Sequence, residues 1–183
     1  MTTTRLTRYD RSMLRLMNDG RGRAWYATAA RRHLAVAAHI TLTAALGGLM
    51  THFFLAEGEP LWPVAVMAVL LFPWMVATGV INGATRGLLE LREHVLDERQ
   101  SAERSRVLAR AHRMTTLLLA AAVLALLAAG LFDGDAPKAY AAPLLIAVLV
   151  VHWVMPLWVA GLRAQDEPAE DDVLEREAPA PLA

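Results

Sequence analysis

The sequence predicts an all-α fold: a four-helix transmembrane bundle made of two hairpins, with a cytoplasmic helical hairpin between them. The chain has 183 residues, of which 56% are hydrophobic. Its apolar residues are concentrated in four blocks without Asp, Glu, Lys or Arg, at residues 34–55, 61–81, 114–132 and 140–162. Each block is close to the ~20 residues with which a helix crosses the hydrocarbon core. A surface helix of a soluble protein would carry charge along one face.

The distribution of charge predicts the topology. The formal net charge is +0, but arginines gather before the first block, between the second and third, and after the fourth. Only Lys138 falls on the opposite side. By the positive-inside rule, both termini and the loop at 84–113 are cytoplasmic. No cleaved signal peptide is recognisable. The Arg- and Ala-rich composition indicates a multi-pass protein of a bacterial cytoplasmic (inner) membrane.

The first 33 residues form a basic cytoplasmic arm. Leu6, Tyr9, Met13 and Leu16 recur at spacings of three and four, with arginines between them. One interpretation is an amphipathic helix on an anionic leaflet. The other is a partly disordered arm that only orients the protein. Nucleic-acid binding is not predicted, because the positive-inside bias explains the arginines and no binding motif accompanies them.

Small residues and prolines predict how the spans pack. The first span has a stripe of small side chains formed by Ala37, Thr41 and Ala45, and the third span has another formed by Ala121, Ala125 and Ala129. These stripes predict that both spans lie inside the bundle or at a subunit interface. The second and fourth spans contain Pro73 and Pro156, at which both helices should kink. Trp74 and Trp158 lie near these prolines. Together with similar outer loops, the pattern is consistent with a duplicated hairpin.

The loop at 84–113 reads as a cytoplasmic helical hairpin. Asp97 followed by Gln100 predicts a helix cap and a turn near residues 96–101. Acidic residues of the first arm would face arginines of the second: Glu90, Glu93 and Asp97; Arg104, Arg106 and Arg110. Leu88, Leu91 and Val95 would pack on the returning arm, or else against lipid if both arms lie flat. The tail at 164–183 carries seven acids and three prolines, which predicts disorder.

Several classes of chemistry lack their usual groups. No charged residue lies within a span, so the chain lacks the ionisable group at membrane depth that proton- and cation-coupled transporters commonly use. The serines, Ser12, Ser101 and Ser105, fall outside the bilayer, and the absence of cysteine excludes thiol chemistry. We predict no enzyme and no metal site.

Three histidines, His39, His52 and His152, are the titratable groups of the spans. Two histidines at equal depth would suit a haem. Counted from the inner arginines, however, His39 and His152 are offset by roughly 6 Å along the membrane normal at ~1.5 Å per residue. Haem is therefore an alternative, and hydrogen bonding between helices or a water-filled cleft is the preferred interpretation.

One stretch of the sequence resembles a linker of known proteins. It consists of the run Leu96-Asp97-Glu98-Arg99-Gln100, with Arg104, Arg106 and Arg110 leading into the third span. It resembles the linker of small four-span membrane proteins of actinobacteria and other Gram-positive bacteria. Some members of those families are similar to immunity proteins or to partners of regulators. The resemblance implies topology and interaction, with no catalytic residues.

Three functions follow as hypotheses. The first is a non-enzymatic accessory or regulatory membrane protein that binds a protein partner, or itself, through Glu90, Asp97, Arg104, Arg106 and Arg110. The alternative is an oligomeric channel or transporter lined by the kinked spans, with Pro73, Thr78, His152 and Pro156, and His39 opposite. The third is a haem-binding electron carrier. The lipid bilayer is a partner in all three.

Overall fold

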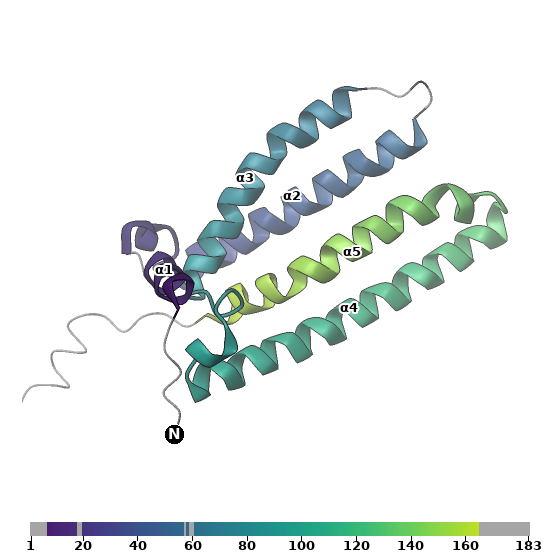
Figure 1. Cartoon of the computed structure of the whole chain (residues 1–183). Coiled ribbons are helices and arrows are strands. Elements are labelled where there is room, and N and C mark those ends of the chain that lie inside the picture. The colour runs from purple at the N-terminus through teal and green to yellow at the C-terminus, as the bar shows by residue number, and fades with distance from the viewer. Residues whose placement is uncertain (1–6, 18–19, 57, 59–60, 165–183) are drawn as a thin grey trace, which may run out of the picture.

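The computed structural model describes residues 7–17, 20–56, 58 and 61–164 of the chain (Figure 1). Two short elements come first, helix α1 (Arg8–Met17) and the 3₁₀ helix η1 (Gly20–Trp25). Four long helices follow, with the 3₁₀ helix η2 (Glu93–Val95) between the second and third: α2 (Ala29–Leu55), α3 (Trp62–Ala84), α4 (Glu98–Phe132) and α5 (Ala136–Arg163). Helices α2 to α5 are each long and apolar enough to cross a membrane. The predicted all-α, four-span fold is confirmed, and the chain is a multi-pass membrane protein.

The long helices form two hairpins, α2 with α3 and α4 with α5. The hairpins meet at the end where α1 lies and diverge toward the opposite end (Figure 1). We call the first of these the arginine-rich end; it comprises α1, residues 85–97, the start of α2, the first turns of α4 and the end of α5. Helix α5 is central, because it packs on α2 and α3 as well as on α4. In the most apolar 18-residue stretch of each helix, 39% of α5 is buried but only 6% of α4.

Gly161 allows α5 to approach the first hairpin closely. A Cβ atom at this position would lie 2.7 Å from Cγ2 of Ile81 on α3 and 2.8 Å from Cγ2 of Val36 on α2. Both neighbours are buried. Where lipid competes for every apolar contact, such close approach is what holds helices together. The core therefore lies in the half of the bundle nearer the arginine-rich end, where these residues join Val107, Ala111 and the stretch 154–160.

The segment between the hairpins differs from the predicted pair of helical arms. Helix α3 ends at Ala84, and residues 85–90 form turns in which Arg86 and Gly87 have φ values of 51° and 70°. Two consecutive residues in the left-handed region cannot continue a right-handed helix. The second predicted arm is the start of α4, which runs without interruption into the span. Its cap is as predicted, because Asp97 and Gln100 form a reciprocal capping box.

The small-residue stripes do not mark the buried faces. Helix α2 packs on α3 and α5, but the face it buries carries Val36, His39 and Thr43, whereas Ala37, Thr41 and Ala45 are exposed. The prediction that the third span lies inside the bundle is wrong for the single chain, since α4 packs mainly on α5. The reason is physical: a small side chain permits close approach but supplies little attraction of its own. Contact between subunits along these stripes stays a prediction.

Candidate functional site

A cluster of polar side chains is buried among the spans around His39 of α2, which is 0% exposed. Trp158 of α5 donates its Nε1–H to His39 Nδ1 over 2.8 Å. On the other side of the ring, His39 Nε2 lies 3.0 Å from Oγ1 of Thr78 on α3. One imidazole thus connects three of the four spans.

Thr43 and Trp74 complete the cluster. Trp74 donates its Nε1–H to Thr43 Oγ1 over 2.9 Å, and Thr43 Oγ1 donates to the backbone carbonyl oxygen of His39 over 2.8 Å. Thr78 Oγ1 likewise donates to the carbonyl oxygen of Trp74 over 2.9 Å. The rings of His39 and Trp74 lie 4.6 Å apart between centroids. We call these five residues, His39, Thr43, Trp74, Thr78 and Trp158, the His39 network.

The donors and acceptors select one proton arrangement. An indole N–H can only donate, so Nδ1 of His39 carries no hydrogen when it accepts from Trp158. The hydrogen of a neutral imidazole then lies on Nε2, which donates it to Thr78. Each threonine hydroxyl keeps its own hydrogen for a backbone carbonyl. The neutral Nε2–H form satisfies every polar side-chain group of the network, as a buried polar cluster requires.

The other intramembrane candidates lie outside this network. His152 is exposed on α5, and His52 is exposed on α2 with its ring 5.2 Å from that of Trp62. Pro73 is exposed and Pro156 is half-buried, and their helices continue through them. Both ring nitrogens of His39 are hydrogen-bonded and His152 is exposed, so these two residues do not form an opposed pair of imidazole ligands.

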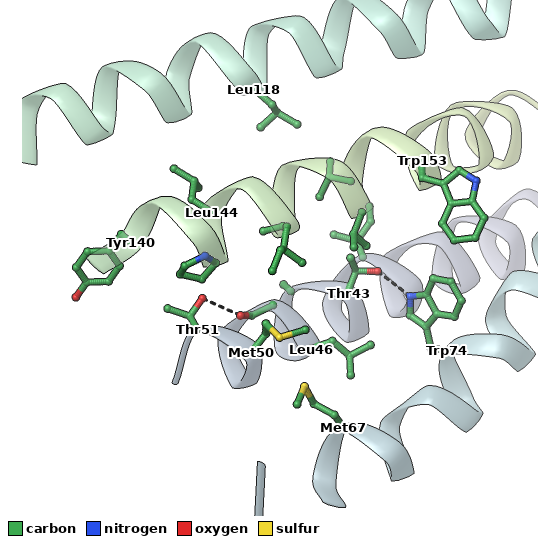
Figure 2. A pocket seen from close by; sticks show the side chains of 18 of the residues that line it. Thr43, Leu46, Met50, Thr51, Met67, Trp74, Leu118, Tyr140, Leu144 and Trp153 are labelled. Atoms are coloured by element: carbon green, nitrogen blue, oxygen red, sulfur yellow. Dashed lines mark hydrogen bonds between the residues drawn. The ribbon is translucent and has the colours of Figure 1, made fainter. Parts of the chain in front are cut away.

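A cleft of about 980 Å³ separates the two hairpins beside the His39 network. All four spans line it, and the surrounding side chains are almost all apolar (Figure 2). Thr43, Trp74 and Trp158 belong both to the network and to the wall of the cleft. Near its other end lie Tyr140 and Thr51, whose hydroxyl donates to the carbonyl oxygen of Gly47 over 2.9 Å (Figure 2). We call this space the inter-hairpin cleft.

Helix α1 is attached to the loop between the hairpins through Asp10, which is 1% exposed. Its carboxylate accepts hydrogen bonds from Oγ1 and the backbone N–H of Thr7, at 2.7 and 2.9 Å. It also lies 3.3 Å from His94 Nε2 and 3.8 Å from Arg92 Nε. The side-chain and backbone hydrogen bonds from Thr7 chiefly lower the pKa of Asp10, and His94 and Arg92 lower it further. The guanidinium of Arg92 also lies 5.0 Å from the ring centroid of Tyr9.

Arg32 ties the start of α2 to the end of α5. The residue is buried, and its Nη2 donates to the carbonyl oxygen of Ala164 over 3.0 Å while Nη1 donates to that of Tyr26 over 3.2 Å. A cation at a helix C-terminus is favourable, because the last carbonyl groups carry a partial negative charge. The arginine-rich end is therefore held together by specific polar contacts as well as by the core.

The predicted interaction residues divide into two groups. Arg104 is half-buried and donates to the carbonyl oxygen of Leu91 over 2.8 Å, Asp97 caps α4, and Glu90 accepts from Asn82 Nδ2 at 3.4 Å. These three residues make structural contacts. Those contacts take the place of the predicted pairing between acidic residues of the first arm and arginines of the second. Arg106 and Arg110, by contrast, are exposed.

Arg106 and Arg110 belong to a longer row. Arg99 and Arg113 are exposed too, and the sequence spacings along the four are seven, four and three residues. At 3.6 residues per turn these spacings place all four on one side of α4, along roughly 21 Å of the helix. We call Arg99, Arg106, Arg110 and Arg113 the arginine row.

Sequence reasoning singled out His39 and Thr78 but missed their partners. Trp74 and Trp158 were noted only for their nearness to prolines, and Thr43 was not among the candidate residues. A usable signal was present, because indole N–H groups buried in a span need acceptors and threonine and histidine are among the few available. Among the described residues, no group of three or more His, Asp or Glu side chains is placed to hold a metal ion.

A comparison with protein-family models, curated proteins and solved structures found no match to this chain. The resemblance of the 96–100 run to the linkers of small four-span membrane proteins therefore stays a prediction.

Proposed function

We propose that this multi-pass protein is a non-enzymatic accessory or regulatory protein that binds a partner protein at its arginine-rich end. The observation that carries the proposal is the arginine row: four exposed guanidinium groups on one side of a helix whose first turn is capped by Asp97. Arginine is suited to this task, because its planar group binds carboxylates through two parallel hydrogen bonds. The partner we infer carries an acidic surface.

The start of α4, which carries the arginine row, is held by a hydrogen bond and by buried contacts. Arg104 fixes the start of α4 to the carbonyl oxygen of Leu91, and Leu88 belongs to the same buried cluster as Val107 and Ala111 of α4. A helix held in this way loses little conformational freedom when a partner binds, which favours affinity. We further infer, from the positive-inside rule, that this end faces the cytoplasm of a bacterial cell.

A channel or transporter has less support from the described spans. Conduction needs polar groups along a path that water can enter. The polar groups of the His39 network are bonded to one another, and the inter-hairpin cleft beside them has an apolar wall. His152 and Pro73, which the pathway hypothesis places along the path, are exposed and do not line the inter-hairpin cleft.

The test compares two triple variants that each remove three positive charges. The first replaces Arg99, Arg106 and Arg110 with Gln, and the second replaces Arg8, Arg11 and Arg15 of α1 with Gln. After extraction in mild detergent, the first should retain less than a tenth of the co-purifying partner, and the second should retain most of it. Lysine in place of the three α4 arginines should give an intermediate result, because the charge remains while the two-pronged geometry is lost.

Orientation must be checked in each variant, because arginine loss weakens the positive-inside signal. A cysteine at Gly134 should react with an impermeant thiol reagent in intact cells, and one at Ser101 should not. If partner binding survives the α4 variant while His152→Ala or Pro156→Ala removes the cellular effect, the pathway hypothesis replaces this proposal.

A further inference from the structure

The acidic tail of the chain starts at the end of the molecule that carries the arginine row. Residues 165–183, for which the sequence predicts disorder, lie outside the described part of the chain, but the residue before them is held in place. The carbonyl oxygen of Ala164 accepts a hydrogen bond from Nη2 of the buried Arg32 over 3.0 Å. Ala164 directly follows α5, which ends next to the first turns of α4 (Figure 1).

The register of the second hairpin places this starting point level with the arginine row. Helices α4 and α5 pack along each other in opposite directions, and Gly134 lies in the short turn between them. Ala164 lies about 30 residues after Gly134 and Arg104 about 30 residues before it, and both helices rise by about 1.5 Å per residue. Ala164 and Arg104 are therefore at nearly the same level, between Arg99 and Arg106 of the row.

The arginine row and the tail carry opposite charges. Among the described residues, none of the four arginines of the row forms an ion pair, and Glu103, which lies beside them on α4, forms none either. The stretch at 166–177 carries one arginine and seven acids: Asp166, Glu167, Glu170, Asp171, Asp172, Glu175 and Glu177. A carboxylate is the group that a guanidinium binds through two parallel hydrogen bonds.

The acidic stretch is long enough to follow the row. An extended chain covers at most about 3.6 Å per residue, so residues 166–177 can span up to roughly 40 Å. The row occupies roughly 21 Å of α4. Several acids can therefore contact the row at the same time, and the acidic stretch begins directly after Gln165.

We propose that the stretch at 166–177 binds the arginine row of its own chain, through ion pairs between carboxylates and guanidinium groups. A single pair of exposed charges is weak, because water and salt screen it. The short connection through Ala164 keeps the acids near the row at an effective concentration in the millimolar range, and several weak pairs then act together. The arginines of α1 are less well placed, because α1 is docked on the loop between the hairpins and α5 packs on α4.

In this arrangement the tail covers the row until a partner displaces it. Negative charge alone is then not enough for a partner to bind, because the tail already supplies it. The row instead selects a partner whose surface holds several carboxylates in fixed positions, since such a surface loses less conformational freedom on binding than the tail does. This consequence rests on the proposed function, whereas the docking of the tail does not.

The test measures the distance between two spin labels in the full chain, purified in dodecyl maltoside without any partner. The chain has no cysteine, so Ala102→Cys, which is exposed beside the row on α4, and Val173→Cys, among the acids of the tail, carry the labels. At 0.1 M salt at least about half of the distance distribution should form one narrow peak, because the tether supplies the acids at millimolar effective concentration. At 1 M salt, where the Debye length falls to about 3 Å, the peak should shrink at least about threefold.

Three triple variants of the labelled chain locate the contact. The first removes three charges of the row, the second removes three arginines of α1, and the third removes three acids of the tail: Arg99→Gln, Arg106→Gln and Arg110→Gln; Arg8→Gln, Arg11→Gln and Arg15→Gln; Glu170→Gln, Asp171→Asn and Asp172→Asn. The first and third should reduce the narrow peak at least about threefold, because each removes several of the pairs that act together. The second should leave the peak nearly unchanged, although it removes as many positive charges as the first.

A broad distribution in the parent at 0.1 M salt would overturn the proposal, and so would a narrow peak that persists in the row variant. Loss of the peak in the α1 variant alone would show that the tail binds the N-terminal arm instead. A peak that is present in detergent but absent in bilayers containing phosphatidylglycerol would show that anionic lipid occupies the row, which also contradicts the proposal. The proposed function is judged separately, by co-purification of the partner, so either one can fail while the other stands.

Discussion

Replacing His39 with Leu should destabilise the bundle by about 1–3 kcal/mol, mainly through Trp158. The leucine is similar in size to the imidazole but cannot accept the indole N–H, and Trp158 is only 8% exposed. A buried donor left without an acceptor costs about 1–3 kcal/mol. Thr78 loses less, because its hydroxyl still donates to the carbonyl oxygen of Trp74.

The contribution of the hydrogen bond itself is measured by a double-mutant cycle with Trp158→Phe. Removing both partners eliminates the orphaned donor, so the double variant should be more stable than the sum of the single effects predicts. Measured couplings between membrane helices average about 0.6 kcal/mol and reach about 1.7 kcal/mol. The contact of 2.8 Å is short for an N–H···N bond and fully buried, so we expect a coupling in the upper part of that range.

The assay is unfolding of the protein in mixed micelles as the mole fraction of dodecyl sulfate rises, followed by circular dichroism. His152→Leu is the matched control, because it removes an exposed imidazole from a span, and its effect should stay within about 0.5 kcal/mol. Strict additivity of His39→Leu and Trp158→Phe would refute the reasoning, because the bond between them would then contribute nothing.

Two further predictions concern the packing of α5 and the docking of α1. Gly161→Ala should destabilise the bundle by about 1–3 kcal/mol in the same assay, because its Cβ would lie under 3 Å from Ile81 and Val36. The control is Gly79→Ala, where a Cβ meets nothing within 4 Å; it should be neutral or stabilising by up to about 1 kcal/mol. A larger loss of stability for Gly79→Ala than for Gly161→Ala would contradict the packing argument. The lowered pKa of Asp10 means that its carboxylate stabilises the docked α1 fully above its unfolded pKa of about 3.9 and loses that effect as pH falls through the lower folded value. Spin labels on cysteines at positions 12 and 105 should therefore give one narrow distance distribution at pH 7 that broadens below about pH 4, and Asp10→Asn should broaden it at pH 7 as well; a distribution unchanged in both cases would show that Asp10 does not hold the helix.

The spans and the cap of α4 could be predicted from the sequence because their causes are local. An uncharged run of about 20 residues specifies a spanning helix wherever it occurs. The Asp97–Gln100 capping box involves two side chains three residues apart, and both of its hydrogen bonds form. Neither inference needs knowledge of the rest of the chain.

The first arm of the loop was mispredicted because tertiary contacts override its helical pattern. Leu88 and Leu91 are buried, as expected, but they lie in and just after the turns that follow α3, where Arg86 has a positive φ. Gly87 permits this path, since a Cβ atom there would lie 2.6 Å from Cγ of Met17 on α1. The constraint comes from a helix some seventy residues earlier, which no local pattern can indicate.

The partners of His39 were missed for the same reason. Thr78 and Trp158 are 39 and 119 residues away from it in sequence. The depth of each residue within its span could be estimated from the sequence, but not the rotation of each helix about its axis. That rotation decides which polar group is buried, and it leaves His152 exposed while His39 is enclosed.

The single His39 network also bears on the idea of a duplicated hairpin. If the entry to α2 at His33 corresponds to the entry to the third span at His112, then His39 and Thr43 correspond to Leu118 and Ala122. The second hairpin therefore has a tryptophan for the network, Trp158, but no acceptors of its own at these positions. Leu118, 46% exposed, lines the inter-hairpin cleft instead. Without a polar anchor to the first hairpin, α4 is held mainly by α5, and the space left between it and α2 is the cleft. If the two hairpins are duplicates, this replacement of polar by apolar residues in α4 accounts for the asymmetry of the bundle.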